Sequence, residues 1–219
     1  RNTATDLQQG LDAAAPSTGV IIDLRGNAGG LLDEATAVVD LFVSEGTIVS
    51  TKGPDGVTLE LHKAKSNTPF KSLKTIIVTD GDSASASEIV AGAMRAMSGT
   101  PIVGSPTYGK WSVQRMYVFE DQSAIKLTVA RYHIADKDAG TDLTGLQPDV
   151  LVTRSTEQQK TLDRLRHMTQ SIEGADVLID QLAKKDANNV AHPYLGPLTE
   201  RLTLDPQLAA AWTLALDNH

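Results

Sequence analysis

The sequence contains no cysteine, which excludes a thiol nucleophile, a disulfide-linked scaffold and a zinc site with thiolate ligands. No apolar run approaches the roughly 20 residues that a membrane-spanning helix requires. The net charge is −7 and the basic residues are scattered, so the basic stripe of a nucleic-acid-binding protein is absent. This acidic balance is typical of a soluble protein.

Neither an initiator methionine nor a signal peptide stands at the start of the chain, which opens with Arg1 and Asn2. We therefore expect a trimmed or excised piece of a longer protein. The 219 residues, 41% of them hydrophobic, are enough to bury the core of one large domain, alone or with a helical appendage.

Hydrophobic periodicity predicts an α/β layered fold. Short apolar runs such as residues 20–24 and 75–79 are typical of buried strands, and apolar residues spaced three and four apart between them indicate helices. The expected helices cover residues 4–15, 35–42 and 85–97, and the expected strands cover residues 20–24, 47–51, 57–61, 75–79, 102–103, 113–119 and 124–130. Alternation of strand and helix through residue 104 favours the α/β class.

The later part of the chain changes character. Residues 124–129 alternate apolar and polar side chains, which predicts a strand with one buried face. From about residue 155 the pattern is helical only, and Asp205-Pro206 fits the N-cap and first residue of a last helix. An earlier helix is predicted from Leu162, Leu165, Met168 and Ile172. We expect a core over residues 1–154 and an all-helical C-terminal extension over 155–219, which either packs on the core or mediates homo-oligomerisation.

A serine-rich block, Ser83 to Glu88, follows one predicted strand and opens a predicted helix. A turn of this kind can present a hydroxyl at the sheet edge, beside backbone N–H groups that the helix does not use. Those N–H groups can bind an oxyanion. The block also fits a plain helix cap, because serine is a preferred N-cap residue.

Lys110 lies at the entry to a predicted strand, directly after a glycine. A lysine can deprotonate a serine only when its amine is neutral, and the pKa of a solvated lysine side chain is about 10.4. Burial among apolar groups lowers the pKa of an amine. The alternative is a solvated lysine on a loop, which is the usual environment of this residue.

A glycine pair, Gly29 and Gly30, ends the segment that follows the first predicted strand. Glycine permits backbone angles that could aim an N–H group at a substrate oxygen. The segment matches neither of the phosphate-binding patterns GxxxxGK[ST] and GxGxxG. It also fits a plain turn in which Asp23 and Arg25 form ion pairs. The five histidines lie outside any recognisable catalytic or metal motif.

Taken in order, the three segments resemble the C-terminal processing peptidases, or tail-specific proteases, of family S41. That family's pattern is D-L-R-x-N-x-G-G, then [ST]-A-S-A-S-E, then [FY]-G-K-G-x-V-Q. The matching segments are residues 23–30, 83–88 and 108–114, and residues 124–132 and 145–149 also fit. The resemblance covers about residues 4–152.

The resemblance implies a serine endopeptidase with a Ser–Lys dyad, on a layered fold like that of crotonase and ClpP. Carried over by position, Ser85 is the nucleophile, Lys110 is the general base and Gln114 orients the lysine. Residues four apart in a strand face the same side, so Lys110 and Gln114 can converge.

The resemblance further implies an oxyanion hole made by the N–H of Ala86 and of a glycine in the pair Gly29 and Gly30. The reaction would need no metal or cofactor, and the substrate would be the C-terminal tail of a protein. An exported location, in the periplasm, a lumen or outside the cell, follows from the family alone.

Two departures from the family pattern leave alternatives open. Trp111 replaces the usual glycine after the base, where an indole could seal Lys110 from water, shape a specificity pocket or block it. The family usually carries a PDZ domain before the core, and we expect none in this chain. One alternative is an inactive member that binds peptides or proteins, and another is a crotonase-like enzyme that acts on a thioester.

Overall fold

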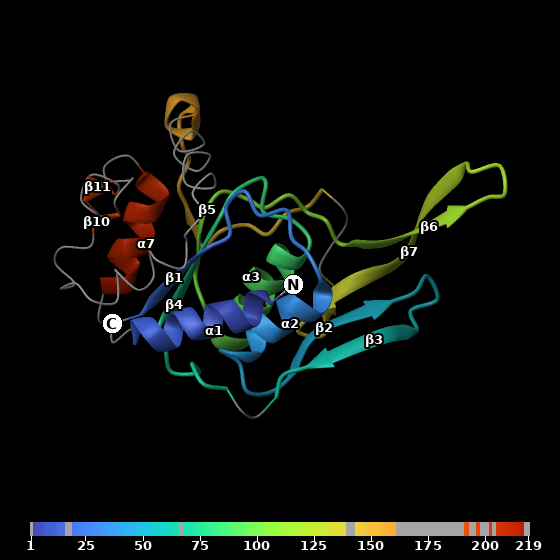
Figure 1. Ribbon diagram of the computed structural model, residues 1–219, viewed down its shortest axis with the longest axis horizontal. Helices are drawn as coiled ribbons and strands as arrows, with labels where there is room; N and C mark the ends of the chain where they lie inside the picture. Colours follow the sequence, from blue (N-terminus) through green and yellow to red (C-terminus); the bar gives the residue numbers. More distant parts are fainter. Residues whose placement is uncertain are drawn as a thin grey trace.

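The computed structural model describes residues 2–15, 19–65, 68–138, 143–160, 191–192, 196–197, 202 and 205–216. A four-stranded parallel sheet forms its centre, in the order β1-β4-β5-β9 (Figure 1). These strands are β1 (Val20–Asp23), β4 (Thr75–Thr79), β5 (Ile102–Gly104) and β9 (Val150–Leu151). Because the strands are parallel, the segments that leave their carboxyl ends meet at one edge of the sheet, and ligand sites of α/β proteins form at such edges.

Helices cover both faces of this sheet (Figure 1). The helices are α1 (Thr3–Ala14), α2 (Leu32–Asp40), α3 (Ala86–Ser98) and α7 (Pro206–Leu216). The side chains of β4 alternate between the two faces: Ile77 joins the main core with α2 and α3, whereas Ile76 and Val78 pack with Ala211 of α7. The predicted α/β layering is confirmed, and the fully buried run of β4 is explained by the helices on each side.

The second sheet is antiparallel and consists of two hairpins, in the order β3-β2-β7-β6 with β8 beside β7. Its strands are β2 (Thr47–Lys52), β3 (Thr58–Lys63), β6 (Ser112–Val118), β7 (Ala124–Ile134) and β8 (Lys137–Asp138). Both hairpins extend away from the helices, and β6–β7 reaches furthest (Figure 1). Lys110, the predicted general base, therefore lies close to the point where this hairpin leaves the body of the protein.

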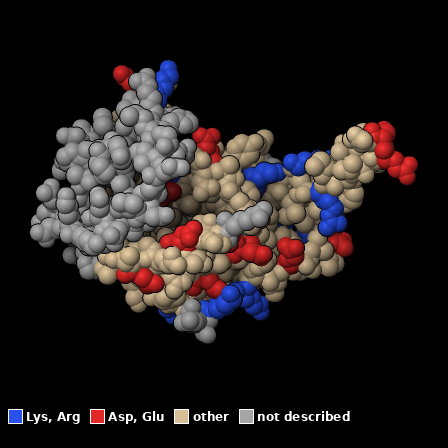
Figure 2. All heavy atoms as spheres, viewed as in Figure 1, with Lys and Arg blue, Asp and Glu red and all other residues tan. Residues whose placement is uncertain are grey.

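The prediction of a single buried face for residues 124–129 is wrong. Residues 124–128 are all exposed, and Ile125 and Leu127 are 43% and 45% accessible. These residues form a strand, as predicted from their alternating apolar and polar side chains. In the described part of the chain, however, no other layer covers the far end of the hairpin. Figure 2 shows acidic side chains at the tip of this hairpin, and charges of both signs are interspersed over the visible face.

Helix α7 begins where the sequence predicts. The Leu208 N–H donates to Asp205 Oδ1 at 3.2 Å, so Asp205 caps the helix and Pro206 is its first residue. The extension is not all-helical, however, because strands β10 (Ala191–His192) and β11 (Gly196–Pro197) pair antiparallel within it. Glycine and proline near these strands are poor helix formers, which explains the local change.

The helix predicted from Leu162, Leu165, Met168 and Ile172 lies outside the described residues. Among the helices that the structure describes, none has the length and apolar character that a membrane crossing demands.

Trp111 is a core residue. Its side chain is completely buried, it belongs to the main hydrophobic cluster, and its indole N–H donates to the Thr144 carbonyl at 2.8 Å. Because the indole is buried with a paired N–H, it anchors the start of β6 to the core. Of the three roles considered for Trp111, this placement argues against a blocked site.

Candidate active site

The serine turn, residues 80–85, joins the end of β4 to the start of α3. Ser85 is the N-cap of α3, with φ 56° and ψ −116°, in the positive-φ region that favours glycine. A non-glycine residue held there stores strain of order 1–3 kcal/mol. Strained strand-to-helix turns lift a side chain out of the sheet edge, and the structure presents Ser85, half-buried, in this way.

We expect Ser85→Gly to be more stable than Ser85→Ala by about 1 kcal/mol, because glycine adopts this backbone at little cost while alanine keeps the strain. Both variants lack the same hydroxyl, so the difference isolates the backbone. Equilibrium unfolding in urea measures it. A glycine variant less stable than the alanine variant would show that this turn is unstrained.

The hydroxyls of the other two serines of the block bind backbone carbonyls of the segment that follows β1. Ser83 Oγ donates to the Leu24 carbonyl at 2.8 Å and accepts from the Asp80 N–H at 3.0 Å. Ser87 Oγ donates to the Asn27 carbonyl at 3.0 Å. Both serines thereby fasten the serine turn and α3 to the segment that follows β1.

Lys110 ends the lysine loop, residues 107–110, and Trp111 separates it from β6. Its Nζ donates to Gln114 Oε1 at 3.1 Å and to Ser112 Oγ at 3.3 Å. The side chain is half-buried, and none of the ion pairs in the described residues involves it. Both partners are uncharged oxygens, which orient the amine without an ion pair.

Ser85 Oγ is not among the hydrogen-bond partners of Lys110 Nζ in the described residues. Catalytic hydrogen bonds of this kind commonly shorten only in the complex with substrate, so this separation does not remove either residue as a candidate. What brings the two residues together is a third side chain.

Glu88 connects the serine turn to the lysine loop. Its Oε2 accepts the Ser85 N–H at 2.8 Å and the Lys110 N–H at 2.8 Å, so these two nitrogens share one oxygen. Its Oε1 accepts the Gly109 N–H at 2.7 Å and the Thr107 hydroxyl. Glu88 is completely buried, and four donors to one carboxylate fix both segments in a single arrangement.

The glycine loop, residues 25–30, lies against the serine turn. The Asn27 carbonyl accepts the Ala84 N–H at 3.0 Å, and Asn27 Oδ1 accepts the Gly29 N–H at 2.9 Å. Gly29 has φ +91°, and a Cβ added there would lie 2.5 Å from the Ala84 carbonyl oxygen and 2.7 Å from the Ala86 nitrogen. Only glycine lets the two backbones approach this closely.

Two backbone donors beside Ser85 have no acceptor in the described part of the chain. The Ala86 N–H belongs to the first turn of α3, where helical N–H groups lack intrahelical partners. The Gly30 N–H is likewise unbonded, whereas the Gly29 N–H is used by Asn27. Of the expected pair of glycines, Gly30 is therefore the better candidate for an oxyanion donor.

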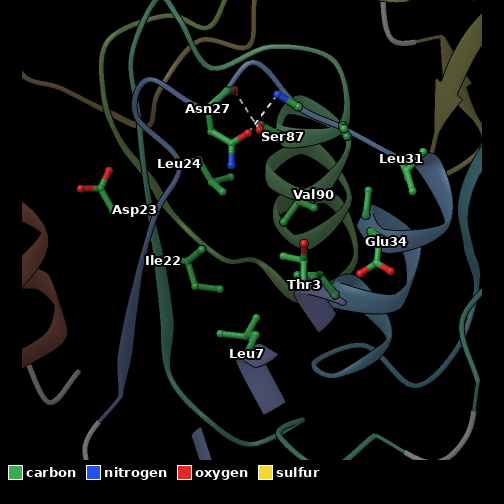
Figure 3. A pocket seen from close by; sticks show the side chains of 15 residues that line it. Thr3, Leu7, Ile22, Asp23, Leu24, Asn27, Leu31, Glu34, Ser87 and Val90 are labelled. Carbon is green, nitrogen blue, oxygen red and sulfur yellow. Dashed lines mark hydrogen bonds between the residues drawn. The ribbon is translucent and has the colours of Figure 1, made fainter. Parts of the chain in front are cut away.

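A pocket of about 520 Å³ opens beside these donors. Gly29, Gly30 and Ala86 are among its lining residues, and Ile22, Leu24 and Val90 point into it (Figure 3). Further apolar wall comes from Leu7, Ala35 and Val38, and polar groups come from Thr3, Asn27, Glu34 and Ser87. The pocket can receive an apolar side chain next to a carbonyl held by the donors.

Arg25 anchors the start of the glycine loop, as the ion-pair interpretation of this segment predicts. Its side chain is 4% exposed, and its NH2 lies 2.6 Å from Asp23 Oδ2, with Asp205 on the other side. Burial alone would lower the pKa of the guanidinium, but the hydrogen bond and charge of Asp23, with those of Asp205, raise it above its usual range. Arg25 therefore remains a fixed cation.

The structure adds two residues to those that the sequence indicates. Ser112 binds the amine of Lys110, and the two-residue spacing of 110, 112 and 114 in the sequence is the signal that could have suggested it. Glu88 stands three residues after Ser85, in the S-x-x-E spacing of a capping box, which suggests its bond to the Ser85 N–H. No local sequence pattern predicts the hydrogen bonds between Glu88 and the lysine loop.

Residues 1–152 match the model of Peptidase family S41. The chain is 39% identical over 136 residues to a carboxy-terminal-processing protease of Bartonella bacilliformis, covering 61% of this chain and 31% of that protein. It is 35% identical over 136 residues to the carboxy-terminal processing protease CtpA of Bacillus subtilis, covering 61% and 29%.

Among solved structures, the photosystem II D1 C-terminal processing protease superposes with a TM-score of 0.61 at 29% identity, covering 69% of this chain and 39% of that chain. The chain thus spans about a third of the length of the curated relatives it matches.

Proposed function

The chain belongs to peptidase family S41, and we propose that it is a serine endopeptidase that cleaves proteins near their C-termini. Ser85 is the nucleophile and Lys110 is the general base. The observation that carries this assignment is the buried Glu88 carboxylate, which holds the N–H groups of both residues on one oxygen. The three proteins compared above are named as C-terminal processing proteases, which supports cleavage near the C-terminus of the substrate.

Acylation begins when neutral Lys110 takes the proton of Ser85 and the oxygen attacks the scissile carbonyl. The carbonyl oxygen gains negative charge, which the N–H groups of Ala86 and Gly30 stabilise. The ammonium of Lys110 then protonates the leaving amine, and an ester to Ser85 remains. Gln114 and Ser112 support this role because they hold the amine through uncharged oxygens.

Deacylation repeats the same proton transfers with water in place of the serine. Lys110 deprotonates the water, which attacks the ester, and the departing Ser85 oxygen recovers the proton. The residues named here supply the base, the nucleophile and the oxyanion donors, so each proton has a donor and an acceptor within this site.

The pocket beside the oxyanion donors fits the side chain that precedes the scissile bond. A carbonyl placed on Ala86 and Gly30 would direct that side chain between Ile22, Leu24 and Val90. The apolar lining favours an apolar residue in this position of the substrate.

We also propose an exported location. Relatives of this chain include peptidases named as chloroplastic, in Tetradesmus obliquus and Arabidopsis thaliana, which supports a compartment outside the cytosol.

A fluorophosphonate probe tests the assignment, because it forms a bond to an activated serine with loss of fluoride. We expect labelling of the wild-type chain, no labelling of Ser85→Ala, and a loss of at least about 10³-fold in rate for Lys110→Ala. In-gel fluorescence with timed quenching measures the rate. Labelling that persists in Ser85→Ala would overturn the proposal, and a folded but unlabelled wild type would favour the binding-module alternative.

A further inference from the structure

The C-terminal helix α7 is tied to the glycine loop through a buried ion pair. Arg25 NH1 lies 2.7 Å from Asp205 Oδ2 and 2.8 Å from Asp205 Oδ1, although the two residues are 180 positions apart. Their side chains are 4% and 5% exposed. Gln207 adds a second contact, with its Oε1 3.3 Å from the same NH1.

The guanidinium uses its donors on two sides. Nε and NH2 bind Asp23 Oδ1 and Oδ2 at 2.8 and 2.6 Å, while NH1 binds Asp205, the N-cap of α7, and Gln207 in its first turn. Asp23 also contributes to the pocket lining, but its carboxylate points to the side opposite the side chains of Ile22 and Leu24 (Figure 3). The end of β1 therefore presents its apolar side chains toward the candidate site and its charges toward α7.

A displacement of Arg25 would be transmitted to the oxyanion donors through a few neighbouring residues that are held by hydrogen bonds. The next residue, Gly26, donates its N–H to Asp80 Oδ1 at 2.9 Å, and Asn27 binds Ala84, Ser87 and Gly29. Gly30 follows directly. Since a shift of about 1 Å in a catalytic group can lower a rate by 10²-fold, the anchor at the start of this loop matters for chemistry.

We propose that Asp205, the N-cap of α7, is a positioning residue that sets the oxyanion hole through Arg25. This inference rests on the proposed function, since it assigns the glycine loop to the oxyanion hole. The proposed role of Asp205 in positioning the glycine loop differs from a role in the stability of the fold alone. The apolar contacts of α7 with Ile76, Val78 and Val103 would dock the helix, whereas the Arg25–Asp205 pair would align the loop.

The test separates binding from chemistry in the reaction of the full chain with the fluorophosphonate probe. Asp205→Asn keeps a good helix cap but removes the charge that Arg25 binds, and Asp205→Ala removes both. We expect the maximal labelling rate, kinact, to fall by about 10- to 100-fold in each variant, with KI within about twofold of wild type. Circular dichroism at the assay temperature establishes that each variant is folded.

Ala211→Gly is the matched control, because Ala211 is buried on the same helix and packs in the apolar cluster with Ile76, Val78 and Val103. It lowers the stability of α7 without touching the ion pair, and we expect its kinact to equal that of wild type. An unchanged kinact in both Asp205 variants, or an equal loss in Ala211→Gly, would overturn the inference and leave the proposed function intact. A folded wild-type chain that the probe does not label would defeat both.

Discussion

Replacing Glu88 with alanine is expected to destabilise the protein by about 3–5 kcal/mol and to lower the rate of fluorophosphonate labelling by at least about 10²-fold. The variant would leave the N–H groups of Ser85, Gly109 and Lys110 and the Thr107 hydroxyl without their acceptor, in a position that is completely buried. Each unsatisfied buried donor costs about 1–3 kcal/mol, and these costs are not additive. The serine turn and the lysine loop would then separate.

Glu88→Gln distinguishes lost hydrogen bonds from lost volume. The glutamine has nearly the same size, but its NH2 group is itself a donor. It would face two donors whose hydrogen bonds a carboxylate oxygen accepts in the wild type. We expect this variant to resemble alanine more closely than wild type, both in the urea midpoint and in labelling rate. Glu120→Gln, the same change on an exposed hairpin residue, should alter stability by less than about 0.5 kcal/mol. A Glu88→Gln variant with the midpoint and labelling rate of wild type would refute the bridging role.

Glu88 also shows where reasoning from the sequence stops. The S-x-x-E spacing indicates a bond from its side chain to the Ser85 N–H, because that contact lies within one helical turn. Its bonds to Gly109 and Lys110 join residues 21 and 22 positions away. No periodicity encodes such a contact, since it depends on how two separate loops meet at the sheet edge.

The parallel sheet was predictable because burial on both faces leaves a strong signal. Residues 75–79 are apolar or β-branched without interruption, as a strand between two helical layers must be. The hairpin β6–β7 shows the opposite case. Alternation over residues 124–129 indicates a strand correctly, but it does not reveal whether a second layer covers the apolar face, and here none of the described residues does so.

Trp111 illustrates a third limit. The sequence shows only that a large residue replaces the family's usual glycine, and that an indole there could point toward the lysine or away from it. Packing decides between these directions, and the structure buries the ring in the main core with its N–H on Thr144. Side-chain direction at the start of a strand depends on neighbours that are distant in the chain.

Gly29→Ala is expected to reduce the labelling rate by about 10²- to 10³-fold, which is the effect of losing one oxyanion donor. The added Cβ would lie 2.5 Å from the Ala84 carbonyl oxygen and 2.7 Å from the Ala86 nitrogen. Both atoms belong to the backbone of the serine turn, which cannot rotate aside as a flexible side chain can. The φ of +91° adds strain for any residue with a Cβ. The glycine loop must therefore move away from Ser85, and it would take the Gly30 N–H with it.

Gly81→Ala provides the control for this prediction. Gly81 lies in the serine turn itself, but a Cβ there would meet no atom within 4 Å and its φ is not positive. Its labelling rate should stay near that of wild type, so a loss specific to Gly29→Ala reports the contact between the two backbones. If Gly29→Ala instead labelled at the wild-type rate, the glycine loop could not be supplying a donor to the oxyanion, because that donor cannot survive the displacement that the clash requires.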